Sequence, residues 1–426
     1  MVEIFPPRTT FYFHEEGVDM SDLYKIEVIA PGDKASKLAA KVCYDSHKNC
    51  AALTMVPHQP GNFRGPVGWV WKKHILEMMM NHEIDGDGNI INWEMLEEKE
   101  NDGAGGKPAF FTVIGTQDDF ANLGLEPIVM CIDDFARSGR FPAIVANDIN
   151  VKKITKENYP LFEAMIKGYG DILKQNNLVN ITGEVAIMKF SITAFCDENS
   201  NKQLILNWGA SCVGLCHKDK LIDGSKIKPG MPIVGFYEPG YRCNGGTFFI
   251  NLINAEWGME AVSSERFDFI KKLVVPSKSY AKFITRMHGW NDDGSVGDAL
   301  VNMVGIAHIT GGGIWEKFGE LLPENTGALL DNMFKPADVL REAQDMSWKH
   351  DHLRLSDWQA HGTLHGGCGE LVVCESMEDA DILIHQAGYE GIEAQLIGIT
   401  TQSSENEIII DSKFREGKRL SSLRPE

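Results

Sequence analysis

The chain has 426 residues, a formal net charge of −19, 43% hydrophobic residues and 24% charged residues. This length suits two domains, and the composition is that of an ordinary globular protein. A chain with this much negative charge is a poor partner for nucleic acid or an anionic membrane. We therefore expect any phosphate site to be built locally from backbone N–H groups and a few cations.

The sequence gives no pattern of a signal peptide or of a membrane span, which needs about 18 apolar residues in a row. Nine cysteines are scattered along the chain, without the C-x-x-C spacing typical of structural zinc sites. We therefore expect reduced thiols and a cytoplasmic location.

We expect residues 1–66 to be irregular, and hydrophobic periodicity predicts alternating helices and strands in residues 67–216. We expect helix 67–82 and a short acidic helix 93–100, which together form a helix–loop–helix insertion at 67–100. An apolar run at 127–132 is either a strand or the start of a helix. The other expected elements are strand 108–116, strand 142–147, helix 157–174, strand 178–181, a turn at 182–184, and strands 204–208 and 211–215.

A polar, turn-rich segment at 219–230 predicts a domain boundary near 217–222, which gives domains 1–216 and 217–426. The second half alternates again, so the predicted fold class is α/β (α+β). Its expected strands are 232–236, 304–309, 327–331, 369–374 and 392–399, and its expected helices are 246–254, 276–288, 297–303, 314–321, 336–345 and 377–387.

The sharpest local pattern is the segment Ala307 to Glu316, in which an expected strand leads through Gly311, Gly312 and Gly313 into a helix. Glycines let the backbone approach a ligand, and a helix start favours an anion. His308 and Thr310 stand where they could orient a substrate. A tight turn that holds no ligand explains the three glycines equally well.

A second loop between an expected strand and helix, Glu238 to Gly246, offers Arg242 and the Asn244 amide. Carboxylates also follow several expected strands, where sites of α/β folds collect: Asp118-Asp119, Asp133-Asp134 and Glu184. Converging carboxylates suit Mg²⁺, which bridges nucleotide phosphates.

Two further patterns offer metal chemistry. Glu83 to Glu94 resembles a calcium-binding EF-hand loop with Gly88 at position 6, although Glu replaces the usual first Asp and a second copy is missing. A polar turn between two helices is the alternative. His361 and His365 have the i,i+4 spacing of metal ligands, but the neighbouring glycines favour a loop.

Several segments, in order along the chain, resemble the aminoimidazole ribonucleotide (AIR) synthetase family, whose members are phosphoribosylformylglycinamidine cyclo-ligases. The Gly-rich segment Ala307 to Lys317 carries the resemblance most clearly. It extends to the segments Glu15-Glu-Gly-Val-Asp19, Pro127 to Gly139, Thr182-Gly-Glu-Val-Ala-Ile-Met188, Ile222-Asp-Gly-Ser-Lys226, Cys243-Asn-Gly-Gly246 and Val275 to Tyr280.

The resemblance implies a cytosolic homodimer whose N-terminal domains share a β-barrel and whose C-terminal domain is α/β. It also implies an enzyme of purine biosynthesis, which uses ATP and Mg²⁺ to close formylglycinamidine ribonucleotide into AIR. Two alternatives stay open. One is a superfamily enzyme with another substrate, and the other is an inactive or regulatory relative, responsive to calcium through 83–94.

The site residues that the resemblance implies fall into three groups. Asp102, Asp134 and Glu184 would bind metal, and His308, Asp134 and Lys107 would be catalytic. Nucleotide or substrate would contact Gly103, Gly105, Thr182, Gly183, Asn244, Gly245, Thr310, Gly311, Gly312 and Gly313. The family's Gly-Thr-Asp-Gly motif has two competing registers, Asn101 to Lys107, which we prefer, and Ile114 to Asp119.

Overall fold

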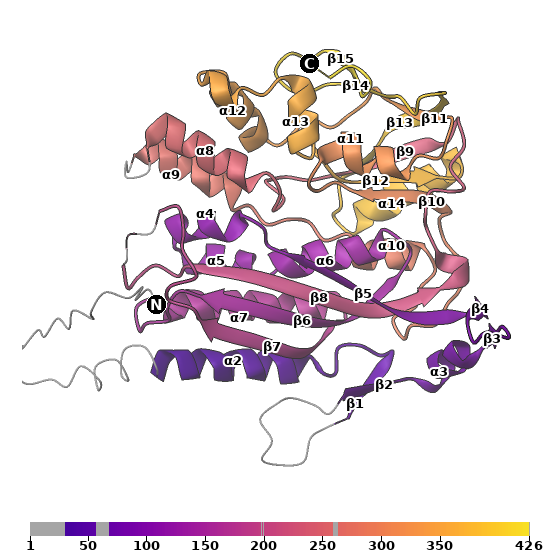
Figure 1. Ribbon diagram of the computed structural model, residues 1–426, viewed down its shortest axis with the longest axis horizontal. Coiled ribbons are helices and arrows are strands. Elements are labelled where there is room, and N and C mark those ends of the chain that lie inside the picture. The colour runs from indigo at the N-terminus through magenta and orange to yellow at the C-terminus, as the bar shows by residue number, and fades with distance from the viewer. Residues whose placement is uncertain (1–29, 57–67, 197, 199, 259–262, 426) are drawn as a thin grey trace, which may run out of the picture.

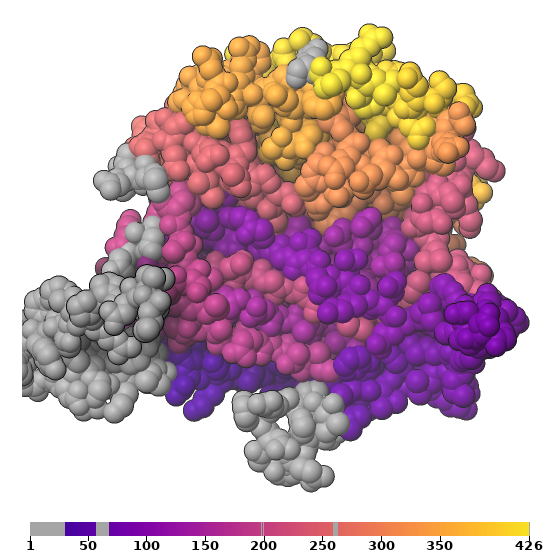
Figure 2. Space-filling model, in the orientation of Figure 1, coloured from indigo at the N-terminus to yellow at the C-terminus, as the bar shows by residue number. Residues whose placement is uncertain are grey.

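The computed structural model describes residues 30–56, 68–196, 198, 200–258 and 263–425, so the segment Glu15–Asp19 lies outside the described residues. Two large sheets dominate the fold, one in each half of the chain (Figure 1). The purple and pink N-terminal half lies directly against the orange and yellow C-terminal half (Figure 2). This mixed α/β arrangement confirms the predicted fold class.

The four-stranded sheet has the order β5-β8-β6-β7 and is antiparallel except for the pair β6–β7. The crossover between β6 and β7 is the amphipathic helix α7, which the periodicity predicts. Apolar side chains such as Met165 and Ile166 bury one face of that helix. The bounds are β5 (Met95–Gly103), β6 (Phe141–Val151), α7 (Tyr159–Gln175), β7 (Val179–Ile187) and β8 (Leu206–His217).

Four further helices pack along this half. Helix α6 is apolar nearly all round because it lies between the sheet and the C-terminal half, and it buries ten of its eleven residues. The helices are α2 (Ala30–Ser46), α4 (Lys107–Ile114), α5 (Gln117–Leu123) and α6 (Glu126–Ala136).

The seven-stranded sheet has the order β10-β12-β9-β13-β11-β14-β15 and is antiparallel except for β11–β14. Its central strands are apolar on both faces, which is expected of strands that have helices on both sides. The strands are β9 (Pro232–Tyr237), β10 (Met303–His308), β11 (Thr326–Leu330), β12 (Cys368–Cys374), β13 (Ala394–Gln402), β14 (Ile408–Asp411) and β15 (Arg419–Ser421).

Helices surround this sheet, and α14 lies against β9, β12 and β13. Within the described residues, no helix combines the length and apolar character that a membrane crossing needs. The helices are η2 (Lys218–Lys220), α8 (Gly246–Trp257), α9 (Ser264–Leu273), α10 (Ala281–Met287), α11 (Gly313–Lys317), η3 (Gly319–Leu321), α12 (Asp338–Ser347), η4 (Asp351–Leu353), α13 (Asp357–Thr363) and α14 (Met377–Tyr389).

One continuous hydrophobic core joins the two sheets. It contains Val145 and Cys212 from the four-stranded sheet together with Val234 and Val372 from the seven-stranded sheet. Helices α6 and α10 meet inside it, as do α4 and α9. The seam between the halves is therefore packed as a protein interior.

Several expected elements are wrong. The expected strand 108–116 is helix α4, which starts beside Pro108 and ends at Gly115 with a positive φ of 66°. The expected acidic helix 93–100 is strand β5. The run 127–132 belongs to helix α6, which is one of its two expected alternatives. The apolar pattern of 108–116 misled because burial on all sides removes the periodicity that separates helices from strands.

The expected helix–loop–helix insertion is also wrong, and the expected helix 297–303 is irregular chain that leads into β10. A strand pair and a short helix precede the loop 85–89, which is the turn of a hairpin that protrudes at the lower right of Figure 1. The elements are β1 (Leu53–Val56), β2 (Gly68–Trp71), α3 (Lys73–Met80), β3 (His82–Ile84) and β4 (Ile90–Trp93).

Candidate functional site

Three glycine-rich loops meet at the seam: 103–106 after β5, 243–246 before α8, and 311–313 before α11. A Cβ added at Gly105 would clash with the carbonyl oxygen of Cys243, and one at Gly106 would lie 3.2 Å from Cα of Gly246. The Gly311 position lies beside the amide oxygen of Asn244, at 3.6 Å. The structure thus brings together the predicted residues Gly103, Gly105, Asn244, Gly245, Gly311, Gly312 and Gly313.

Most of these glycines serve packing between loops. A Cβ at Gly313 would clash with the carbonyl oxygen of His361, and one at Gly245 would lie 3.2 Å from that of Thr363. Gly311 differs because the amide oxygen of Asn244 is its nearest neighbour. A ligand that needs close approach to backbone therefore finds room at Gly311 and not at the other two glycines of the triplet.

Lys107, predicted to be a catalytic phosphate cation, does not face a cavity. Its side chain is fully buried, and Nζ lies 2.7 Å from a carboxylate oxygen of Glu126. The ammonium also donates to the carbonyl oxygens of Tyr241 and Val275, both at 2.7 Å. Because these partners use its three N–H donors, Lys107 clamps the two halves together. The geometry argues against a role in phosphate binding.

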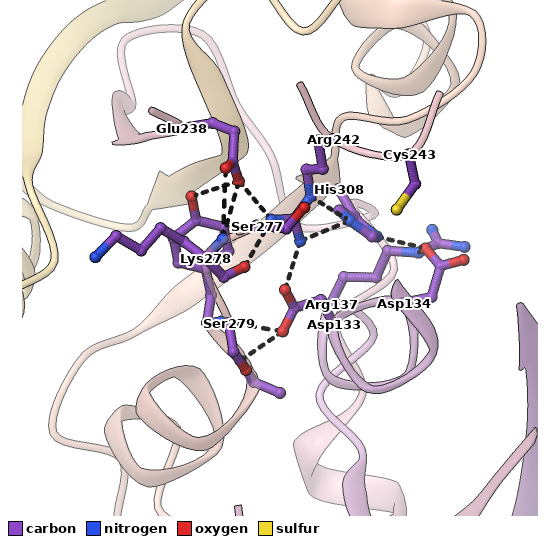
Figure 3. A network of polar contacts seen from close by, with 12 residues as sticks. Asp133, Asp134, Arg137, Glu238, Arg242, Cys243, Ser277, Lys278, Ser279 and His308 are labelled. Atoms are coloured by element: carbon purple, nitrogen blue, oxygen red, sulfur yellow. Dashed lines mark hydrogen bonds and ion pairs between the residues drawn. The ribbon is translucent and has the colours of Figure 1, made fainter. Parts of the chain in front are cut away.

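Arg242 organises a second buried network at the seam (Figure 3). It donates to Asp133 at 2.5 Å, to Glu238 at 2.6 Å and to the carbonyl oxygen of Lys278 at 2.6 Å. Its Nε and one terminal nitrogen approach Nε2 of His308 at 3.0 and 2.9 Å. Arg242 has no acceptor atom, so the Nε2 of His308 must accept and carries no proton.

The Nδ1–H of His308 consequently points at Asp134. Nδ1 lies 2.9 Å from Oδ1 of Asp134, and Arg137 donates to the same carboxylate at 3.0 Å. Burial alone would raise the pKa of Asp134, but these two donors outweigh it and lower that pKa to about 2. The predicted catalytic residues His308 and Asp134 are therefore adjacent.

The pKa of Asp102 is shifted in the opposite direction. Burial on β5 raises its pKa, and the nearby negative charge of Asp134 raises it further. Two interacting carboxyl groups with pKa values displaced in opposite directions are the arrangement that supplies an acid and a base at one site. The pair Asp102 and Asp134 is thus a candidate for proton transfer.

A cavity of about 300 Å³ opens beside Asp134. It places carboxylates next to cations and hydroxyl groups, which suits a ligand that carries both an anionic group and a positively charged nitrogen. The lining residues are Asp134, Arg137, Ser138, Ile222, Asp223, Ile306, His308, Thr310, Lys317, Glu320 and Leu321.

The third predicted metal ligand, Glu184, lies elsewhere. Glu184 on β7 pairs with Asp148 on β6, and Asp148 pairs with Gly209 on β8. Gly209 in turn pairs with Gly103 on β5. Asp102 is the next residue along β5, so its side chain points to the other face of the sheet. Three strand spacings, about 14 Å, separate β7 from β5. The expected cluster of Asp102, Asp134 and Glu184 therefore does not assemble within one chain.

Thr182 and Gly183 share the edge strand β7 with Glu184 and form part of that strand, where a turn was expected. They border a different groove of about 620 Å³, which runs between α2 and the sheet. The structure therefore separates these two predicted nucleotide contacts from the glycine loops of the seam.

The structure does not support the two remaining metal-site hypotheses, the calcium-like loop and the pair His361 and His365. Asp85 accepts N–H bonds from Asp87 and Asn89, both at 2.9 Å, so it closes the hairpin turn of the calcium-like loop. His361 lies in helix α13, and burial lowers the pKa of both His361 and His365 to about 4. Among the described residues, no three His, Cys, Asp or Glu side chains converge as metal ligands.

Sequence reasoning missed Glu126, Arg137, Lys317 and Glu370 at the seam. A single charged residue inside the apolar strand Cys368–Cys374 is a signal that would have found Glu370. Glu126 follows the same logic at the start of an apolar helix, whereas Arg137 and Lys317 look like ordinary surface cations in the sequence.

The chain is similar to AIR synthase-like proteins in part of its sequence and in its fold. Residues 295–411 match the family described as AIR synthase related protein, C-terminal domain. Phosphoribosylformylglycinamidine cyclo-ligase from Staphylococcus carnosus (strain TM300) is 24% identical over 301 residues, which cover 69% of this chain and 77% of that enzyme. The Staphylococcus aureus (strain JH9) cyclo-ligase is 24% identical over 305 residues, covering 70% and 78%.

Among solved structures, E. coli HypE superposes with a TM-score of 0.50 at 11% identity, over 92% of this chain and 97% of that chain. This likeness concerns the fold alone. The relation to AIR synthase proteins rests on the sequence matches and not on this likeness.

Proposed function

We propose that this chain is an ATP-dependent enzyme whose substrate binds in the 300 Å³ seam cavity. The first candidate reaction is the ring closure of formylglycinamidine ribonucleotide to AIR, because the similar curated proteins are cyclo-ligases for this substrate. The observation that carries the proposal is the position of Asp134, held by His308 and Arg137 at the cavity wall.

The cavity chemistry agrees with a substrate that bears a phosphate and an amidine. Arg137, Lys317 and the hydroxyl of Thr310 offer cations and a donor to phosphate oxygens. The carboxylates of Asp134 and Asp223 offer acceptors to amidine nitrogens. Asp134, with its lowered pKa, stays ionised at neutral pH and is suited to attract the positive charge of an amidine group.

The residues of the seam fit ATP better than they fit Mg²⁺. Gly311, beside Asn244, has room for close approach of a phosphate, which ATP would supply as the activating group. The expected Mg²⁺ ligands are divided between the two faces of the sheet, so these three residues do not fit a single ion. We therefore assign no step to Mg²⁺.

A superfamily enzyme with another substrate is the second candidate. The burial of Lys107 favours it, because the expected phosphate cation is engaged with Glu126 and two carbonyl groups. Phosphate binding must then rely on Arg137, Lys317 and backbone N–H groups. An inactive relative is the third possibility, and nucleotide binding distinguishes it from the other two.

We also propose a homodimer in a reducing, cytoplasmic compartment. One end of the four-stranded sheet exposes Asn101, Asp148, Thr182 and Glu184, a polar surface that a second sheet of the same kind could cover as the family resemblance implies. Eight of the nine cysteines are buried free thiols. Light scattering of the purified protein, with Thr182→Arg as the variant, tests the dimer.

The decisive experiment supplies ATP and formylglycinamidine ribonucleotide and measures ADP and AIR. We expect turnover in the natural chain and a loss of at least tenfold in Asp134→Asn and Arg137→Ala. The matched control is Glu324→Gln, an exposed carboxylate in a loop before β11, which should keep full activity.

The other outcomes separate the candidates. ATP hydrolysis that depends on a different phosphorylated acceptor supports the second candidate. If an ATP analogue and ribose 5-phosphate both fail to raise the melting temperature of the natural chain, the enzymatic proposal is wrong.

A further inference from the structure

Glu370 lies at the centre of the seam network without a partner. It sits on β12, paired with His308 on β10 and with Phe236 on β9, so these three side chains share the face of the sheet that meets α6. The side chain is fully buried, and neither carboxyl oxygen has a hydrogen-bond partner among the described residues.

The neighbours of Glu370 are charged but already committed. Helix α6 presents Asp133 and Asp134, and Arg137 follows at its C-terminal end. Tyr280, just before α10, also lies close to Glu370. Arg242 is the nearest buried cation, yet its five N–H groups go to Asp133, Glu238, Lys278 and His308. A Glu370 carboxylate would therefore receive no donor.

Burial of an ionised carboxylate without a donor costs several kcal/mol, so such a group keeps its proton instead. Burial raises the pKa of Glu370 well above its usual value, and the negative charge of Asp133 adds to the rise, against a smaller opposing effect of Arg242. An isolated acid in a core also lowers the stability of the fold, and proteins tolerate such a group where it serves a function.

The role follows from the competition for Arg242. If Glu370 lost its proton, its carboxylate would attract the guanidinium and draw N–H donors away from Nε2 of His308. His308 would then lose the contact that fixes its Nδ1–H towards Asp134. We propose that Glu370 is a positioning residue that stays protonated at neutral pH and thereby leaves Arg242 free to hold His308 against Asp134.

This proposal goes beyond the proposed function and is tested without turnover. The full-length protein is compared with Glu370→Gln, a neutral variant of the same shape, and with Glu324→Gln as the matched control. Infrared spectroscopy follows the band of a protonated carboxyl group, and NMR of ¹⁵N-labelled histidine follows the two ring nitrogens of His308, both as functions of pH.

We expect a protonated carboxyl band at pH 7 in the natural chain and in Glu324→Gln, and its absence in Glu370→Gln. As the pH rises, the natural chain should lose this band and the Nδ1–H signal of His308 together. Glu370→Gln should keep the His308 signal until it unfolds, because it has no proton to lose at this position.

Three results would overturn the proposal. The first is a natural chain that lacks the band at pH 7. The second is an identical His308 titration in the natural chain and Glu370→Gln, including one in which neither changes before unfolding. The third is a change in unfolding midpoint alone, which would give Glu370 a purely structural role. These outcomes are independent of whether the enzyme closes formylglycinamidine ribonucleotide.

Discussion

At the scale of single residues, the seam shows how neighbours decide what a charged group can do. Lys107 and Arg242 are both fully buried cations, and the N–H groups of each donate hydrogen bonds to other groups of the protein. Arg137 and Lys317 border the cavity instead. The residue types that the sequence offers for phosphate chemistry therefore divide into two that hold the structure and two that can meet a ligand.

The lowered pKa of Asp134 predicts how stability depends on pH. A carboxyl group whose pKa is lowered on folding stabilises the protein above its unfolded pKa of about 4, and this contribution disappears as the pH falls through about 2. The shift corresponds to about 2 kcal/mol.

We therefore expect Asp134→Asn to lower the free energy of unfolding by about 2 kcal/mol at pH 7 and by much less near pH 2. Urea denaturation at both pH values measures this difference. An equal loss at the two pH values would mean that packing, and not charge, accounts for the effect.

Lys107 gives a second test at this scale. Lys107→Met leaves Glu126 as an unpaired buried charge, so we expect a loss of about 3–5 kcal/mol in the free energy of unfolding. The double variant Lys107→Met with Glu126→Gln removes both charges and should recover a large part of that loss. If the double variant binds an ATP analogue as tightly as the natural chain, Lys107 has no part in phosphate binding. A selective loss of affinity in the folded double variant would restore the phosphate role.

At the scale of elements, amphipathic segments were predictable and segments buried on every side were not. Helix α7 shows one apolar face, and the sequence gives its place within two residues. Helices α4 and α6 are buried nearly all round, so their sequences are equally consistent with strands. The glycine loops were predictable because strand, glycines and helix follow one another in the sequence, but their contacts with one another depend on the tertiary fold.

The glycine triplet offers a matched pair of variants. Gly311→Ala meets only the Asn244 amide oxygen at 3.6 Å, so we expect a stability change within about 1 kcal/mol and weaker binding of an ATP analogue. Gly313 has a φ of 61° and its Cβ would strike the carbonyl oxygen of His361, so Gly313→Ala should lose at least about 1–3 kcal/mol. Thermal unfolding and calorimetric titration measure the two effects. Unchanged nucleotide affinity in Gly311→Ala would remove Gly311 from the site.

At the scale of the whole molecule, the sequence predicts two α/β halves, and the structure adds how they join. The continuous core and the two buried clusters around Lys107 and Arg242 join residues more than 100 positions apart, such as Asp133 and Arg242. No local pattern encodes such pairs, which is why the candidate site was only partly predictable. The sequence located His308 and Asp134, but it wrongly grouped Glu184 with Asp102.

The shared core predicts cooperative unfolding. Because apolar side chains of both sheets pack in one cluster, neither half can lose its structure without exposing the apolar surface of the other. We expect circular dichroism and tryptophan fluorescence to report one coincident transition in urea. Two separated transitions would show that the halves are stable independently.

The same continuous core bears on how the molecule can be divided. A cut between His217 and Pro232 would fall in a polar connection but would strip the apolar cover from α6 on one fragment and from β9 and β12 on the other. Each fragment produced alone would then expose apolar core surface and aggregate. When the two fragments are produced together in one cell, they should associate and refold into the complete structure. The chain could then serve as a split reporter whose signal requires that the two fragments associate.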